Sequence, residues 1–195
     1  MDKRMQEWKA VSLTGRLCYL FMCIECYLVF CYPDRDWTPL ARKMWAWTED
    51  WWSEGCYRYS HLVPRYLLEF EIVPQYLLEF DIIKEINEKE FDGELSEQEY
   101  NILVKLYAGI TNGSEEDEIN EVLMLPLEFD SICECSDFSD ADEPTIELIA
   151  KAQAILLRHS IDIPSIDMVS GFSVHQKNGW GDFVDSTYLS IILNT

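Results

Sequence analysis

The first long apolar segment runs from Leu17 to Tyr32 and contains one acidic residue, Glu25. A helix that is apolar on nearly all of its faces must be surrounded by other elements. At about 16 residues the run is shorter than the roughly 20 that a membrane span needs, and no small-residue cleavage pattern follows it. The pattern therefore predicts the central helix of a folded domain, and neither a membrane span nor a signal peptide.

Helix-start signals and apolar spacing predict further helices downstream. Thr38 is expected to cap a helix with Pro39 at its first position, and capping patterns are found at Ser96 to Glu99 and at Ser114 to Asp117. A helix is also expected over 143–158, with a proline near its start. The apolar face after Pro39 is Leu40, Met44, Trp47 and Trp51, and Trp45 and Trp52 add a second stripe. We interpret it as core packing, with an exposed aromatic binding surface as the alternative.

The ten residues 63–72 recur at 73–82 with eight identical positions. Because Pro74 interrupts a helix, we expect two short helical pieces, or a helix, a kink and a second helix to about Glu90. From Ile161 onward the apolar pattern alternates only weakly, so helix and strand are both open there. The expected fold is one all-α domain, residues 1–195: a helical bundle around the apolar N-terminal helix, with an irregular C-terminal segment. An α+β fold is the alternative.

The charge of the chain is concentrated in its middle. The chain has 36 acidic and 15 basic side chains, and residues 69–143 hold 23 of the acids but only three of the bases. A solvated face that keeps the protein soluble explains part of this excess. Packing like charges into one segment adds repulsion that even spacing would avoid, which favours a surface for a basic partner. The same sign argues against nucleic acid or an anionic membrane as a ligand.

The candidate partner-binding residues are the acidic side chains where this charge is densest. They are Glu115, Glu116, Asp117, Glu118, Glu134, Asp137, Asp140 and Asp142. Trp180, which lies between two glycines, is the candidate aromatic anchor beside them. A buried plug in its loop is the alternative use of this tryptophan.

The seven cysteines are an odd number, and four of them lie in the apolar run, which predicts reduced thiols and a cytoplasmic protein. Cys23 and Cys26 form a C-x-x-C pattern, which we interpret as buried structural thiols. A thiol redox or metal protein is the alternative. No nucleotide-binding, nucleophile-elbow or zinc-protease motif is present. The sequence therefore predicts neither an enzyme nor a cofactor or metal site.

Four short C-terminal stretches carry a resemblance to a known group of proteins. They are Ile163-Pro-Ser-Ile-Asp-Met-Val, Phe172-Ser, Asn178-Gly-Trp-Gly-Asp-Phe-Val-Asp and Leu189-Ser. Over about 30 residues the chain resembles the ending of small bacterial immunity proteins that are paired with polymorphic or contact-dependent growth inhibition toxins. The resemblance implies a non-catalytic cytoplasmic protein that binds one cognate toxin domain, often a basic nuclease, and blocks it. An acidic nucleic-acid mimic that occupies a nucleic-acid-binding protein is the alternative function.

Charge reversal at Asp137, Asp140 and Asp142 is expected to slow association with a basic partner at low salt by at least about tenfold. Loss of electrostatic steering has an effect of this order. The difference should shrink as rising salt shortens the screening length. Association rates measured at several salt concentrations test this expectation. Unchanged rates with intact binding would make the acidic segment a solubility face, and the interface would then be sought on the helix from Trp45 to Trp52.

Overall fold

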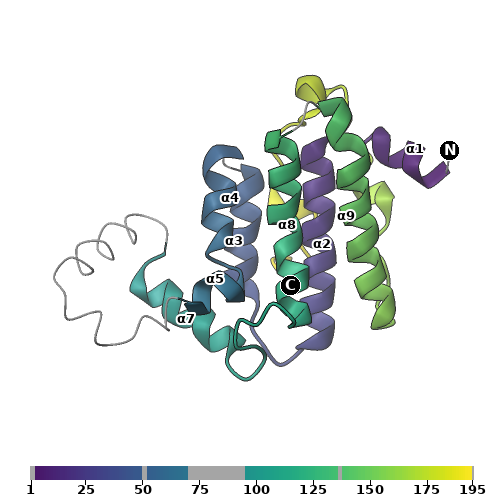
Figure 1. The fold of residues 1–195 in the computed structure, drawn as a ribbon. Coiled ribbons are helices and arrows are strands. Elements are labelled where there is room, and N and C mark those ends of the chain that lie inside the picture. The colour runs from purple at the N-terminus through teal and green to yellow at the C-terminus, as the bar shows by residue number, and fades with distance from the viewer. Residues whose placement is uncertain (1–2, 50–51, 70–94, 136–137, 195) are drawn as a thin grey trace.

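Helix α2 (Leu13–Cys31) lies at the centre of the fold, as the apolar run predicts, and other helices pack around it (Figure 1). The computed structural model describes residues 3–49, 52–69, 95–135 and 138–194. These residues form helices, turns and irregular segments but no strand, which confirms the all-α fold. The other helices are α1 (Lys3–Lys9), α3 (Thr38–Glu49), α4 (Trp52–Ser60), α5 (Pro64–Glu69), α7 (Glu97–Tyr107), α8 (Glu118–Cys135) and α9 (Phe138–Arg158).

Burial of α2 is nearly complete from its start to Leu28, whereas Val29 and Phe30 near its end are exposed. Every residue from Leu13 to Glu25 is buried, and α3, α8 and α9 all pack against the helix. Its N-terminus is capped by Ser12, whose hydroxyl accepts the backbone N–H of Gly15 at 3.3 Å. Among the described helices, α2 is the one long and apolar enough to cross a membrane, but 83% of its apolar window is buried inside the fold.

The tryptophans of α3 lie in the core, as the spacing predicts. Trp45 and Trp47 are both buried, and Trp45 meets Phe21 of α2 edge-on at a centroid distance of 5.3 Å. Trp51 and the side chain of Trp52 lie outside the described part of the chain. The aromatic face of α3 therefore joins α3 to α2.

The predicted helix starts are only partly correct. The capping box of Ser96 and Glu99 is confirmed at the start of α7, with the Ser96 hydroxyl and the Glu99 carboxylate both bonded to backbone N–H groups. At α3 the prediction is wrong by one residue. Thr38 is already helical, and the Asp36 carboxylate accepts its backbone N–H at 3.0 Å.

The second predicted capping box, at Ser114 and Asp117, is wrong. The Ser114 carbonyl accepts the backbone N–H of Asp117 at 3.1 Å, which closes a turn. The Asp117 carboxylate accepts the Thr111 hydroxyl at 2.5 Å. The Ser114 hydroxyl accepts the backbone N–H of Glu116 at 3.3 Å. Both side chains of the box are therefore used in the preceding loop, and α8 begins later, at Glu118.

Helix α9 begins at Phe138, five residues before the predicted start, so Pro144 lies inside it. A proline inside a helix removes one hydrogen bond to the carbonyl four residues earlier. The turn around it is held by Thr145, whose buried hydroxyl donates to the Ala141 carbonyl at 2.7 Å. Arg16 of α2 donates to the same hydroxyl at 2.9 Å, and local start signals could not reveal this tertiary support.

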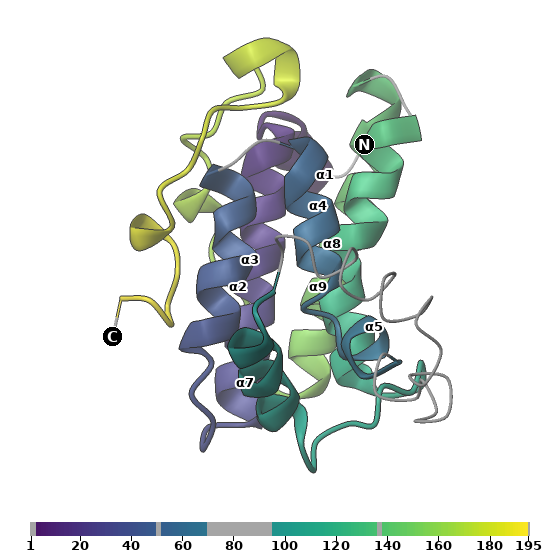
Figure 2. The same ribbon diagram turned by 90° about the vertical axis from the view of Figure 1, so that its left-hand side faces the viewer.

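Residues 161–194 form the irregular C-terminal segment that the sequence predicts, with three short 3₁₀ turns (η2, Ile166–Met168; η3, Gln176–Gly179; η4, Ser186–Tyr188). This tail runs along one side of the helical body, beside α3 (Figure 2). It is joined to the start of α2, where the N–H of Ser12 donates to the Phe172 carbonyl at 2.7 Å. The tail therefore covers a side of α2 that the helices leave open.

The sequence duplication is described only in its first copy. Helix α5 lies within residues 63–72, which confirms the first of the two short helical pieces. The second copy, 73–82, and the expected continuation to about Glu90 lie outside the described residues.

A buried carboxylate on α2, Glu25, fixes the end of the tail. One of its oxygens accepts the Trp45 indole N–H at 2.7 Å and the Ser190 hydroxyl at 2.6 Å. The other accepts the backbone N–H of Ile191 at 2.7 Å. Burial raises the pKa of Glu25, although these hydrogen bonds oppose the rise. One buried residue therefore joins α2, α3 and the tail.

The free energy of unfolding of the native protein, relative to that of the Glu25→Gln variant, is expected to fall as pH rises. Because the folded pKa is raised, the stabilisation by this carboxyl is complete below its unfolded pKa of about 4.3 and is lost as pH rises through the folded value. Urea unfolding of both proteins from about pH 5 to about pH 8 measures the difference. A difference that does not change with pH would contradict this description of Glu25.

Candidate partner-binding surface

The candidate acidic residues do not lie together. Glu118 is the first residue of α8 and Glu115 to Asp117 precede it, whereas Glu134 lies in the last turn of α8 and Asp142 near the beginning of α9. An α-helix of 18 residues is about 27 Å long. The predicted set is therefore divided between the two ends of the α8–α9 hairpin, defined here as residues 114–158.

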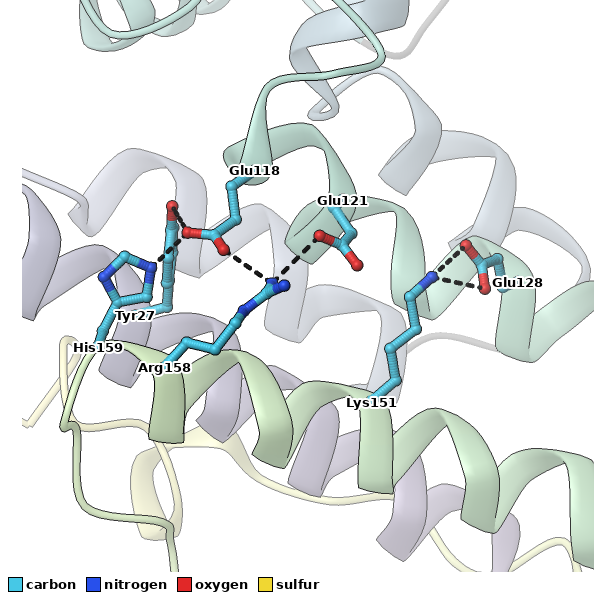
Figure 3. A network of polar contacts seen from close by, with 7 residues as sticks. All are labelled: Tyr27, Glu118, Glu121, Glu128, Lys151, Arg158 and His159. Carbon is cyan, nitrogen blue, oxygen red and sulfur yellow. Dashed lines mark hydrogen bonds and ion pairs between the residues drawn. The ribbon is translucent and has the colours of Figure 1, made fainter.

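At the beginning of α8, Glu118 is the centre of a polar network (Figure 3). Its carboxylate is 2.7 Å from the Arg158 guanidinium, pairs with the His159 ring, and accepts the Tyr27 hydroxyl at 3.3 Å. Arg158 also reaches Glu121 at 3.3 Å. Glu118 therefore joins α8 to the end of α9 and to α2.

Halfway along the hairpin, Lys151 of α9 pairs with Glu128 of α8 at 3.3 Å (Figure 3). Residues 114–158 hold thirteen acidic and two basic side chains, and the two bases are Lys151 and Arg158. Both face acids of α8: Lys151 partly neutralises the middle of the hairpin, and Arg158 partly neutralises the end where α8 begins and α9 ends. The charge that remains for a partner therefore lies mainly toward the other end, where α8 ends and α9 begins.

The three acids before α8 have different surroundings. Glu115 is exposed and pairs with Arg65, while Asp117 is used by Thr111 in the loop. Glu116 is exposed, and no ion pair to it is found in the described residues. Of the predicted acids at this end, Glu116 is the one most available to a partner.

At the other end of the hairpin, the half-buried Asp142 pairs with a residue of the core. Its carboxylate is 2.6 Å from the guanidinium of Arg16, whose side chain is fully buried on α2. Arg16 also donates to the Thr145 hydroxyl at 2.9 Å and to the Val11 carbonyl at 3.1 Å. Burial lowers the pKa of Arg16, and the pair with Asp142 opposes that change. Reversing the charge of Asp142 would therefore disturb folding as well as any binding.

Other acids near Asp142 in the sequence lie on the surface. Glu134, Glu143 and Glu147 are exposed, and the described residues provide no ion pair to any of them. Glu143 and Glu147 are four residues apart and share one face of α9. We call these three residues the acidic end. The sequence prediction named only Glu134 among them, although the i,i+4 spacing on a predicted helix already indicated the other two.

Asp137 lies outside the described residues, and Asp140 is described only as a helical position of α9. Trp180 is half-buried and packs against the core cluster. Its carbonyl accepts the backbone N–H of Thr14 at 2.9 Å and the Thr14 hydroxyl at 2.6 Å. This position supports the alternative of a loop plug more than an exposed anchor.

The C-x-x-C thiols lie on α2, with Cys23 buried and Cys26 half-buried. Burial raises the pKa of Cys23 and raises that of Cys26 to about 11. A nucleophilic or metal-binding cysteine needs the thiolate, which these environments disfavour. In the described part of the chain, no three His, Cys, Asp or Glu side chains are placed to hold a metal ion.

An open cavity of about 530 Å³ lies between α3 and α7. Its charged lining includes Lys43 and Glu99, which pair at 2.7 Å. The hydrogen bond from Lys43 lowers the pKa of Glu99 to about 2. Lys43 and Glu99 therefore compensate each other's charge in this lining. The lining residues include neither a histidine nor a cysteine.

No family model, curated protein or solved structure matches this chain. The resemblance of the C-terminal stretches to immunity proteins therefore stays a prediction. The function has to be inferred from the distribution of charge and exposed side chains on the fold.

The Asp142→Asn variant is expected to lower the free energy of unfolding by about 3 kcal/mol, because Arg16 would be left buried without its anion. The matched control is Glu143→Gln, which removes the same charge from the exposed neighbouring residue and should cost about 0.5 kcal/mol or less. Urea unfolding gives both values. Equal effects of the two substitutions would show that the Arg16 pair does not stabilise the core.

Proposed function

We propose that this protein is an immunity protein that binds a basic toxin domain and neutralises it without catalysis. The observation that carries the proposal is the α8–α9 hairpin, with thirteen acidic and two basic side chains, both of the bases facing acids of α8. The hairpin therefore presents a net negative surface that the fold compensates only in part, through Arg65 at Glu115 and Arg16 at Asp142. Such a surface speeds encounter with a basic protein and rejects acidic ones.

The acidic end is the favoured contact region. Its three glutamates are exposed: Glu134 lies in the last turn of α8, and Glu143 and Glu147 lie in the first half of α9, close in sequence to the half-buried Asp142. Asp142 and Arg16 hold this part of α9 against α2, so the glutamates are displayed on a supported helix. A charge displayed on a rigid element loses less conformational freedom when a partner binds.

The alternative of a nucleic-acid mimic receives less support from this geometry. A mimic needs a continuous row of negative charges that replaces a phosphate backbone, since phosphate contacts dominate nucleic-acid affinity. In the hairpin, Lys151 and Arg158 interrupt the acids of α8. A mimic would also compete with nucleic acid on several unrelated basic proteins, whereas an immunity protein binds one partner.

The reading frame directly upstream of the one that encodes this chain provides the test. Its product should arrest growth when expressed alone, and co-expression of this protein should restore growth. The two purified proteins should form a stable complex. An upstream product that neither arrests growth nor binds this protein would overturn the proposal, and so would binding to several unrelated basic proteins with similar affinity.

The triple variant Glu134→Lys, Glu143→Lys and Glu147→Lys reverses the charge of the acidic end. It is expected to slow association with that toxin domain at low salt by at least about tenfold, which is the order of magnitude of electrostatic steering. The difference should shrink toward physiological salt, where the screening length is about 8 Å. Stopped-flow mixing at several salt concentrations measures the rates.

The control is a triple variant with the same change in net charge, Glu7→Lys, Asp34→Lys and Asp162→Lys, at exposed acids outside the hairpin. It should slow association by less than about threefold, because only the long-range field changes. Equal slowing by the two triple variants would assign the effect to net charge and not to the acidic end.

A further inference from the structure

A cation is held on an aromatic ring and a carboxylate in the C-terminal tail. The Lys177 ammonium lies over the ring of Phe183, 4.4 Å from its centroid, and 3.6 Å from the Asp182 carboxylate. A cation over an aromatic face is attracted by the ring's negative face, and an adjacent carboxylate adds to the attraction. Phe183 and the side chain of Asp182 are both about half exposed, at 51% and 54%. Asp182 and Phe183 are therefore open to solvent although they already hold the Lys177 ammonium.

The loop that carries Lys177 has an unusual backbone. Lys177 and Asn178 have φ of 43° and 56°, in the left-handed region, and Gly179 and Gly181 are also at positive φ. Left-handed backbone costs free energy in residues that carry a Cβ. The loop is held in place by the two bonds from Thr14 to the Trp180 carbonyl. Strain that the surroundings maintain in this way is found preferentially at functional sites.

The tail after this loop is fixed at two points but displays apolar side chains. Val184 donates its N–H to the Thr48 carbonyl at 3.3 Å, and the end of the tail is bound by Glu25. Between these two points, the side chain of Tyr188 is 80% exposed. Exposed aromatic side chains on a fixed backbone have the character of binding hot spots, because little further ordering is needed on association.

We propose that Asp182 and Phe183 bind an arginine or lysine side chain of the basic partner, and that Lys177 occupies this site in the free protein. Tyr188, five residues further along the tail, supplies a second aromatic contact. The proposal rests on the proposed function, since it takes the partner to be a basic protein. The aromatic contacts in this proposal are the exposed Phe183 and Tyr188. Trp180, which the sequence suggested, is packed against the core.

The first test uses a nona-arginine peptide as the probe and measures its affinity by calorimetry. Lys177→Met removes the internal competitor and should tighten binding about threefold, the size of one exposed cation–π contact. The control, Lys105→Met, removes an exposed lysine from α7 and changes the net charge equally. Equal affinities of the two variants would overturn the proposal, because only the long-range field would then matter.

The second test removes the aromatic face. Phe183→Leu should weaken binding of the peptide about threefold, whereas Phe30→Leu, at an exposed phenylalanine near the end of α2, should leave it unchanged. Thermal unfolding checks that both variants fold. Amide chemical-shift changes in the native protein should include residues 177–191. Shifts confined to the α8–α9 hairpin would overturn the proposal.

These outcomes are separate from the fate of the proposed function. If the upstream toxin domain binds but Phe183→Leu and Lys177→Met do not alter peptide affinity, the cation site is wrong and the immunity function stands. If no toxin partner is found but both variants respond as expected, the tail still binds cationic side chains and the proposed function fails.

Discussion

Two ionisable side chains on a buried apolar helix determine how the rest of the chain is arranged. Arg16 and Glu25 are both fully buried on α2, where an unpaired charge would be far more costly than at the surface. Arg16 is paired by Asp142 of α9, and Glu25 is bonded by α3 and by the tail. Apolar packing alone would allow several arrangements around α2, whereas these bonds require particular partners at particular positions.

The same requirement separates the acids of the chain into two groups. Some of them have structural roles: Asp142 compensates Arg16, and Glu118 joins the beginning of α8 to the end of α9. Others, including Glu116 and the acidic end, remain exposed with no ion pair from the described residues. The net charge of -21 is therefore a poor guide to any single acid, and the fold decides which acids can meet a partner.

The predictable features are those that depend on local sequence. The apolar run of α2, the tryptophans of α3 and the capping box at Ser96 each need only a few neighbouring residues, and all three are confirmed. The early part of α9, on both sides of Pro144, is bonded by Arg16 of α2, a partner that the sequence of α9 does not contain. The pair of Arg16 with Asp142 joins residues 126 positions apart, and the bond of Glu25 with Ser190 joins residues 165 apart. No periodicity or capping rule relates such distant residues, so the site prediction could not separate core acids from surface acids.

Hydrogen exchange of this protein, alone and bound to the toxin domain encoded upstream, tests the proposed binding surface most directly. The backbone amides of 134–147 and 177–191 should exchange more slowly in the complex, because the acidic end and the tail become covered. Amides on α4 and α7 should exchange at unchanged rates. Protection confined to α4 and α7, with the acidic end and the tail unaffected, would contradict the account.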